Sequence, residues 1–394
     1  MTEAHAALSM FFELHTRLAG VQAEVRVWRD PKQRRALAPR GHVREFLRLP
    51  STGGAYVLAS LGSPAAFAKG LEGLTLSRPI WLLARRVLQA LAPLGLHRCL
   101  GFQRPGVQLP AGAAVPEREY ALQMGVPGGG QKLVVREWIP GQEESYWKLG
   151  QGQLPSQLVR SEASALRWLA EHRFSEGLAP ELLAAGEEDQ LSWLKMKVLT
   201  GVRPPTALEH SALRFLEQLA GRAPRSLTLQ DSDWRRQLGA RLEAIQAGAP
   251  RIAGACAQAL TALDAELRAE PLAFTPSHGD FTPWNAKLEG GRLRAFDWEF
   301  FSSAAPALFD WHHWQLQTGV LVEHLEHQVL FERLCASTPL AGEMPAARRR
   351  QHLTLYLIEV LVREEWIMQQ GRPDFPQVQW LREARLELLA RTSA

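Results

Sequence analysis

The sequence of 394 residues lacks several features that define particular classes of protein. It has only three cysteines, Cys99, Cys256 and Cys335, and none lies in a Cys-x-x-Cys pair, which argues against structural zinc and a disulfide framework. No uncharged apolar run reaches the roughly 18 residues needed to cross a membrane. The net charge is only +4, from 45 basic and 41 acidic residues, and no strongly basic aromatic face is present, so no nucleic-acid partner is expected.

The N-terminus also lacks the basic segment and apolar core that mark a secretory signal. Separated, unpaired cysteines fit a reducing compartment. We therefore expect a cytoplasmic protein without a transmembrane segment, and the oligomeric state stays open. The clearest basic cluster, residues 29–48, is interpreted as a solvated face.

The residue pattern changes near positions 115 and 200, which predicts three regions. Residues 1–115 are interpreted as an accessory region, with helices over 8–17 and 81–92 and strands over 43–49 and 55–61. The stretch 103–116 holds three prolines and three glycines and is predicted to be a linker or an edge loop.

Residues 116–200 predict an antiparallel lobe and residues 201–394 a mainly helical lobe. In the first, strands are expected over 120–124, 132–138, 145–149 and 192–199, with a glycine-rich turn at 125–130 and a helix over 158–171. In the second, helices surround a loop-rich segment at 271–298, and one helix is expected over 353–370. The order predicts an α+β, two-lobe fold.

The segment with the clearest chemistry reads HGDFTPWN, and FDWEF follows it after a short hairpin. Its polar residues are His278, Asp280, Asn285 and Asp297. Phosphoryl transfer needs a carboxylate to orient and deprotonate an acceptor hydroxyl, and oxygen ligands for Mg²⁺. The spacing His-x-Asp-x-x-x-x-Asn is also that of the kinase catalytic loop.

These two segments resemble the hallmark of the aminoglycoside phosphotransferase and choline kinase-like family, which shares the protein-kinase fold. The resemblance implies that Asp280 is the catalytic base and that His278 orients the catalytic loop. It implies that Asn285 and Asp297 hold Mg²⁺, and that Asp310 braces the loop. It covers residues 118–320.

The same resemblance places nucleotide-binding residues in the strand-rich region. It implies that Lys148, on the third strand of this region, contacts the α- and β-phosphates of ATP and is held by Glu162 on the next helix. It also implies that the turn at 125–130 covers the phosphates. The glycines of this turn, Gly125, Gly128, Gly129 and Gly130, allow backbone amides to approach phosphate oxygens closely. Residues 196–199 are expected to form the hinge whose backbone meets adenine, with Met196 and Val198 as contacts.

The chain departs from protein kinases in two ways. The turn at 125–130 lacks the Gly-x-Gly-x-x-Gly spacing, and Asp297 is followed by Trp-Glu rather than Phe-Gly. No Ala-Pro-Glu element follows Asp297, which argues further against a protein kinase. For His312 and His313 two interpretations stay open, lining an acceptor cleft or packing in the core.

The sequence therefore predicts an ATP- and Mg²⁺-dependent phosphotransferase that acts on a hydroxyl group of a small molecule. A sugar, an amino alcohol and an aminoglycoside remain open as acceptors. The alternative is a nucleotide-binding pseudokinase or scaffold that recruits a partner through residues 1–115.

Overall fold

The computed structural model describes residues 3–21, 25–28, 42–51, 54–73, 79–95, 102–110, 117–174, 177–207, 209–268, 270–371 and 374–392. Cys99 and most of the basic cluster at 29–48 lie outside these residues. The chain divides into two compact units, Met1–Val159 with Leu182–Val198, and Arg160–Glu181 with Leu199–Ala394.

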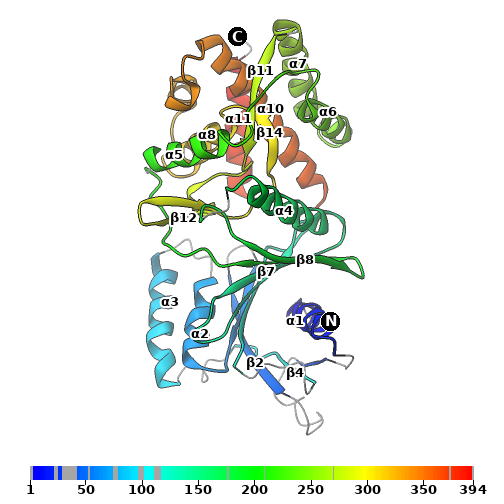
Figure 1. Ribbon diagram of the computed structural model, residues 1–394, viewed down its shortest axis with the longest axis vertical. Coiled ribbons are helices and arrows are strands. Elements are labelled where there is room, and N and C mark those ends of the chain that lie inside the picture. Colours follow the sequence, from blue (N-terminus) through cyan, green and yellow to red (C-terminus); the bar gives the residue numbers. More distant parts are fainter. Residues whose placement is uncertain are drawn as a thin grey trace. The chain divides into compact units, whose positions relative to one another are not determined.

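An antiparallel sheet forms the centre of the first unit (Figure 1). Within the described residues it has nine strands in the order β1-β4-β2-β3-β5-β6-β7-β9-β8. Their bounds are Arg26–Trp28 (β1), His42–Pro50 (β2), Tyr56–Ser60 (β3), Gly106–Leu109 (β4), Glu119–Met124 (β5), Lys132–Trp138 (β6), Ser145–Gln151 (β7), Leu182–Glu188 (β8) and Leu191–Lys197 (β9). Strands from the first 115 residues thus share one sheet with strands from residues 116–200.

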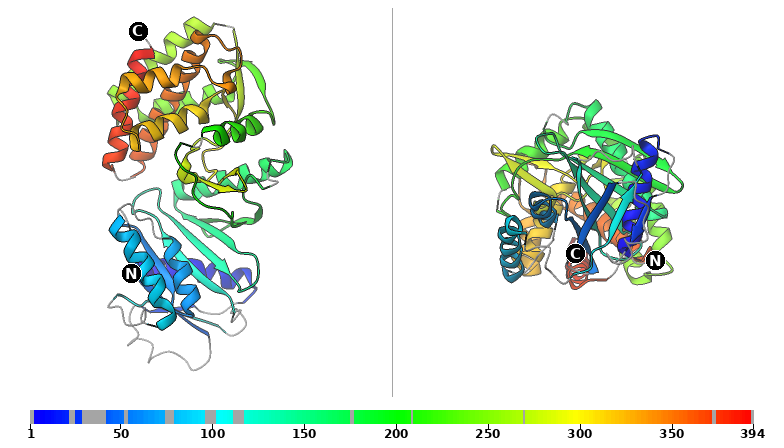
Figure 2. Two further views of the ribbon diagram at one scale, coloured as in Figure 1. Left: turned by 90° about the vertical axis from the view of Figure 1, so that its left-hand side faces the viewer. Right: turned by 90° about the horizontal axis from the view of Figure 1, so that it is seen from below.

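Helices cover both faces of this sheet (Figures 1 and 2). Successive side chains of a strand point to opposite faces. Tyr56 and Leu58 pack with α1 (Glu3–Leu18), whereas Val57 and Ala59 pack with α2 (Pro64–Gly70). The helix α3 (Pro79–Leu91) follows α2 on the same side as Val57 and contributes Leu88 to the same cluster. Buried apolar side chains thus alternate between the two faces of the sheet, and each face is covered by its own helices.

Most of the elements expected in this unit are confirmed, and the exceptions lie in the two outermost strands at each end of the sheet. Residues 103–116 were predicted to be a linker or an edge loop, but β4 lies within them, between β1 and β2. The short strand β1 and the strand β8 had no prediction. The strand expected over 192–199 ends at Lys197. β1 and β4 are paired by backbone hydrogen bonds with each other and β4 also with β2, all from distant segments, a cause that the local residue pattern does not contain. β8 instead forms a hairpin with β9, the next strand along the chain.

The second unit is mainly helical. Its helices are α4 (Gln153–Glu171, whose first residues belong to the first unit), α5 (Glu209–Ala220), α6 (Asp233–Ile245), α7 (Pro250–Leu267), α8 (Phe309–Leu321), α9 (His327–Cys335), α10 (Ala346–Gln369) and α11 (Pro376–Thr392). Its strands are β10 (Arg225–Thr228), β11 (Pro271–Ser277) and β14 (Ser302–Pro306) in one sheet, and β12 (Ala286–Glu289) and β13 (Arg292–Ala295) in a hairpin.

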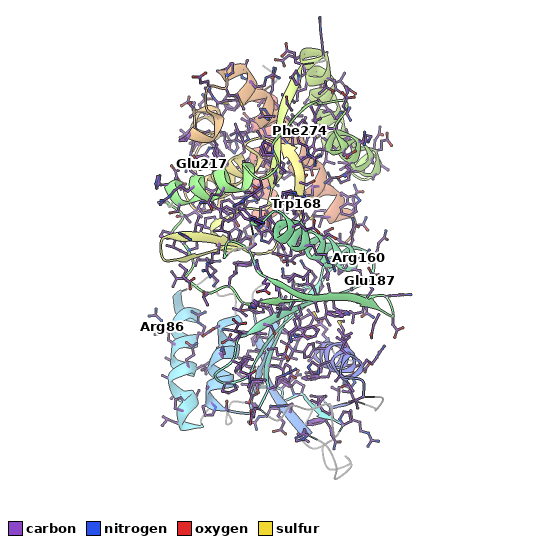
Figure 3. All side chains as sticks on the ribbon, in the orientation of Figure 1. Arg86, Arg160, Trp168, Glu187, Glu217 and Phe274 are labelled. Carbon is purple, nitrogen blue, oxygen red and sulfur yellow. The ribbon has the colours of Figure 1, made fainter. Side chains whose placement is uncertain are left out.

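The core of the second unit surrounds α10, which is buried without interruption from Gln351 to Arg363. Phe274, labelled on β11 in Figure 3, is fully buried in the same core. A helix buried on all sides lies at the centre of a unit rather than at its surface. The helix predicted over 353–370 is confirmed, and so is the α+β fold of a sheet-containing part followed by a helical one. No helix in the described part of the chain has the length and apolar character to span a membrane.

Candidate active site

The loop predicted to be catalytic follows β11, and its backbone conformation depends on Gly279. This residue has a φ of 83°, in the left-handed region that favours glycine. A Cβ atom here would lie 2.1 Å from the carbonyl oxygen of Phe300. Only glycine therefore permits the loop to pass this close to the segment before β14.

Asp310, in the first turn of α8, holds the start of the loop. Its Oδ2 accepts a hydrogen bond of 2.6 Å from the His278 backbone N–H, and its Oδ1 accepts one of 2.9 Å from the Gly279 N–H. Burial raises the pKa of Asp310 to about 6, although these hydrogen bonds favour the charged form. The bracing contact implied by the resemblance is present.

His278 joins the loop to the strand segment that carries Asp297. Its ring is fully buried, its Nδ1 accepts from the Asp280 N–H at 3.3 Å, and its Nε2 donates to the Phe296 carbonyl at 3.0 Å. Burial lowers the pKa of His278 to about 4, so the ring is neutral near pH 7. These contacts suit a residue that orients the backbone.

The carboxylate of Asp280 is held at both oxygens yet remains partly open. Asn285 Nδ2 donates to Oδ2 at 2.7 Å and to the Asp280 carbonyl at 3.0 Å, and His313 Nε2 lies 2.8 Å from Oδ1. The Asp280 side chain is still 29% exposed. Burial raises its pKa, but the hydrogen bond from His313 and the charge of Arg363 outweigh burial, and the net pKa is lowered. Asp280 is therefore an ionised carboxylate with an accessible edge.

The segment after the β12–β13 hairpin contributes two members to a group of three carboxylates, Glu162, Asp297 and Glu299. The pairing of Ala286 with Ala295 brings Asn285 next to Phe296, whose N–H donates to the Asn285 carbonyl at 3.0 Å. Asp297 follows directly, and its ligand oxygen lies within 4.8 Å of those of Glu162 and Glu299. Asp297 has a φ of 71°, a conformation that costs free energy in a residue other than glycine.

This carboxylate group differs in membership from the predicted metal pair of Asn285 and Asp297. Glu162, on α4, was predicted to hold Lys148, and the structure brings it together with Asp297 and Glu299. Glu299 had no predicted role. Its place two residues after Asp297 in FDWEF, which puts a second carboxylate in the same short segment, was the available signal.

Apart from Glu162, which lies in the second unit, the predicted nucleotide-binding residues lie in the first unit: Lys148 on β7, Gly125, Gly128, Gly129 and Gly130 in the β5–β6 turn, Met196 on β9, and Val198 just after it. Lys148 and Met196 are buried. In the turn, the Gly125 N–H donates to the Lys132 carbonyl at 3.1 Å. The Val198 N–H donates to the Glu144 carbonyl at 3.1 Å, which ties the end of β9 to the segment before β7.

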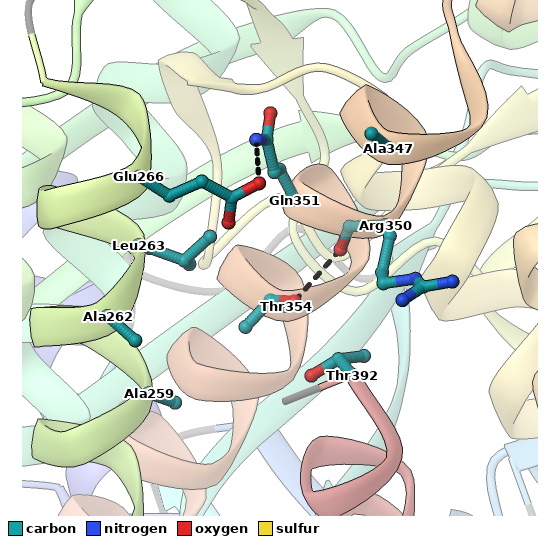
Figure 4. Close-up of a pocket in the computed structure, with 9 residues that line it drawn as sticks. All are labelled: Ala259, Ala262, Leu263, Glu266, Ala347, Arg350, Gln351, Thr354 and Thr392. Carbon is teal, nitrogen blue, oxygen red and sulfur yellow. Dashed lines mark hydrogen bonds between the residues drawn. The ribbon is translucent and has the colours of Figure 1, made fainter. Parts of the chain in front are cut away.

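A separate pocket of the second unit lies between α7 and α10 (Figure 4). Glu266 on α7 accepts a hydrogen bond of 2.6 Å from Gln351 on α10 across it, and Thr354 also lines it. None of its lining residues belongs to the loop or the carboxylate group. This pocket is therefore distinct from the candidate active site.

The sequence profile of the phosphotransferase enzyme family matches residues 148–311. The predicted resemblance to this family is confirmed. The matched segment contains the residues of the loop and of the carboxylate group in the second unit, which are Glu162, His278, Asp280, Asn285, Asp297, Glu299 and Asp310. It also contains Lys148 of the first unit. No curated protein matches the sequence.

Several solved structures are similar to the chain. One is a thermostable mutant of aminoglycoside phosphotransferase APH(4)-Ia in ternary complex with ADP and hygromycin B, with 17% identity, coverage of 69% of this chain and 94% of that one, and a TM-score of 0.48. Another is choline kinase LicA from Streptococcus pneumoniae, with 13% identity, coverage of 66% and 89%, and a TM-score of 0.43. A third is an aminoglycoside phosphotransferase from Alicyclobacillus acidocaldarius, with 16% identity, coverage of 69% and 91%, and a TM-score of 0.37.

Proposed function

We propose that the chain is an ATP- and Mg²⁺-dependent phosphotransferase that moves the γ-phosphate of ATP to a hydroxyl group of a small molecule. The observation that carries the proposal is the carboxylate of Asp280, which is ionised, fixed at both oxygens and partly exposed. A carboxylate in this state accepts a proton from an acceptor hydroxyl placed within hydrogen-bond distance. The match to the phosphotransferase family over the same residues supports this chemistry.

In this proposal Asp280 orients the acceptor hydroxyl and takes its proton as the oxygen attacks phosphorus. Positioning and charge stabilisation supply most of the catalysis in such reactions, so the fixed direction of the carboxylate matters together with its ability to take the proton. Asp310 and His278 keep the backbone of the loop in place. Lys148 contacts the α- and β-phosphates, the 125–130 turn covers them, and residues 196–199 meet the adenine.

The residues present fit a divalent cation. Asp297 and Glu299 supply carboxylate oxygens, the donors that Mg²⁺ prefers. The side-chain amide of Asn285 directs its nitrogen to Asp280, which leaves its side-chain oxygen, Oδ1, to serve as a metal ligand. Bound Mg²⁺ neutralises charge on the phosphates. We assign Asn285, Asp297 and Glu299 to the metal, and Glu162 either to it or to Lys148.

The acceptor class within the proposal covers sugars, amino alcohols and aminoglycosides. The first experiment is an ADP-release assay with Mg²⁺ and ATP against a panel of these three classes. The proposal predicts acceptor-dependent release that falls at least a hundredfold in Asp280→Asn, because the amide cannot take the proton.

Asp233→Asn is the matched control, since Asp233 is an exposed aspartate on α6 outside the site. It should retain the activity of the unchanged protein. Binding of ATP without release of ADP for any acceptor would favour the alternative of a nucleotide-binding pseudokinase or scaffold, with residues 1–115 recruiting a partner. Release of ADP that is equal in Asp280→Asn and the unchanged protein would contradict the role of Asp280.

A further inference from the structure

His313, on α8, lies behind the proposed catalytic carboxylate and has no exposed side-chain surface. Its Nε2 lies 2.8 Å from Asp280 Oδ1, and its Nδ1 lies 3.2 Å from the hydroxyl of Tyr356 on α10. Three side chains from the loop, α8 and α10 are thus linked in one row, which is buried at His313 and Tyr356 and partly exposed at Asp280. The sequence alone leaves the place of His313 open between an acceptor cleft and the core.

Which atom donates and which accepts in each hydrogen bond of this row follows from the protonation of Asp280 and Tyr356, the residues at its two ends. An ionised carboxylate only accepts hydrogen bonds, so the contact to Asp280 requires the proton of a neutral imidazole to be on Nε2. The Nδ1 atom then carries a lone pair and accepts from the Tyr356 hydroxyl. Burial raises the pKa of Tyr356, which keeps this hydroxyl protonated. Every donor in the row meets an acceptor.

The surroundings favour a neutral His313. Burial lowers its pKa, while the hydrogen bond and charge of Asp280 raise it. The guanidinium groups of Arg363 on α10 and Arg385 on α11 also lower the pKa. These two guanidinium groups already place positive charge near the ring, so a protonated His313 is unfavourable. The side-chain nitrogen of Gln317 lies 3.4 Å from Nε2, and because Nε2 already donates to Asp280 this contact is not a hydrogen bond.

We propose that His313 is the positioning residue of Asp280, and that Tyr356 fixes the tautomer in which His313 does this. The proposal rests on the proposed function, and it assigns to α8 and α10 the task of aiming the base. Asn285 holds Oδ2 and His313 holds Oδ1, so the plane of the carboxylate is set from both sides. The remaining lone pairs receive the acceptor hydroxyl.

In the reaction, the proton of the acceptor hydroxyl passes to Asp280 and the acceptor oxygen bonds to phosphorus as the bond to ADP breaks. His313 keeps its Nε2 proton throughout, because the N–H of a neutral imidazole is far too weak an acid to protonate a carboxylate. The hydrogen bond that Nδ1 accepts from Tyr356 disfavours the gain of a second proton. His313 therefore acts by orienting the Asp280 carboxylate. A carboxylate that points in another direction lowers kcat even where substrates still bind.

Substitutions at position 313 separate this role from simple packing. Glutamine places its amide nitrogen near the position of Nε2, whereas leucine fills the volume without a donor. We expect His313→Gln to keep kcat within about threefold and His313→Leu to lower kcat tenfold or more, with KM for ATP changed less than twofold in both. The neighbouring buried His312 gives the matched control, because His312→Gln makes the same change one residue away from the contact with Asp280. Equal losses in His313→Gln and His313→Leu, or full activity in His313→Leu, would overturn the proposal.

A spectrum tests the arrangement independently of turnover. Histidine labelled with ¹⁵N, assigned through His313→Gln, should show His313 neutral with its proton on Nε2 at pH 7. Asp280→Ala should shift that Nε2–H proton resonance, and Tyr356→Phe should shift Nδ1. A charged ring, or a proton on Nδ1, contradicts the tautomer. A normal spectrum in a protein that is inactive with every acceptor would contradict the proposed function instead.

Discussion

At the scale of single residues, Gly279 is the backbone position on which the loop depends most directly. Gly279→Ala places a Cβ atom 2.1 Å from the Phe300 carbonyl and forces an L-residue to keep a φ of 83°. The left-handed conformation alone costs about 1–2 kcal/mol. We predict a loss of about 2 kcal/mol or more in the free energy of unfolding, measured in urea, and a tenfold or greater fall in ADP release.

Gly254 provides the control for this substitution. It lies in α7 and is exposed, and the position that a Cβ atom would take there has nothing within 4 Å among the described residues. Gly254→Ala should stabilise the protein by about 0.5–1 kcal/mol, because alanine is the better helix former. A similar loss in both variants would show that the loop position is not special.

Buried histidines predict a loss of stability in mild acid. His352 on α10 is buried, neither ring nitrogen has a hydrogen-bond partner among the described residues, and burial with the charge of Arg348 lowers its pKa to about 4. Between that value and the unfolded pKa of about 6.5, the unfolded chain binds a proton that the folded chain does not. Stability contributed by His352 is therefore complete above pH 6.5 and declines as the pH falls towards 4.

The variant His352→Leu removes this dependence. The difference in free energy of unfolding between pH 7.5 and pH 5.5 should shrink by about 1 kcal/mol relative to the unchanged protein. His210→Leu, at an exposed position of α5, is the control for loss of a histidine. An unchanged pH difference in His352→Leu would contradict this role of the buried ring.

The residues of the site differ in how far the sequence reveals them. Asp280, Asn285 and Asp297 lie in short segments whose spacing expresses the chemistry directly, so the sequence alone predicts them. It does not assign His313 to Asp280, because 33 positions separate the two and only the packing of α8 brings them together. Glu299 lies in the same segment as Asp297, FDWEF, but its proximity to Glu162 depends on the position of α4.

At the scale of elements, α1 is a structural part of the first unit. Phe12 is fully buried and packs edge-on against Tyr120 of β5, with ring centroids 5.2 Å apart, and against Phe46 of β2. Phe12→Ala should lower the free energy of unfolding by about 3–5 kcal/mol, the usual cost of truncating a buried phenylalanine. Glu13→Ala, at an exposed position of the same helix, should change it by less than about 0.5 kcal/mol.

Helices were predicted more completely than strands, and the reason is physical. The apolar spacing of α1 and α10 is a local property, since each helix makes its own backbone hydrogen bonds. The strand β4 instead depends on β1 and β2, which pair with it from far along the chain. Its prolines and glycines favoured a linker, and long-range pairing overrode that local preference. Whether residues 1–115 act as a separate accessory region stays a prediction.

At the scale of the whole molecule, metal binding should appear as stability. A ligand that binds the folded chain alone stabilises it by about 2.7 kcal/mol at a concentration of 100 times Kd. We predict that Mg²⁺ with ATP raises the midpoint of thermal unfolding and that EDTA reverses the shift. Asp297→Asn and Glu299→Gln should each reduce the shift, whereas Glu332→Gln, at an exposed position of α9, should leave it unchanged. A full shift in both site variants would remove these carboxylates from the metal site.

The most direct test of the central claim is to follow the γ-phosphate itself. ATP labelled with ³²P at the γ-position is incubated with Mg²⁺, the chain and the acceptor that gives the fastest ADP release. We predict a labelled acceptor that is stable to acid, as a phosphate ester of a hydroxyl group is, and its absence with Asp280→Asn. Label found only as inorganic phosphate, or on the acceptor equally with Asp280→Asn, would contradict the claim.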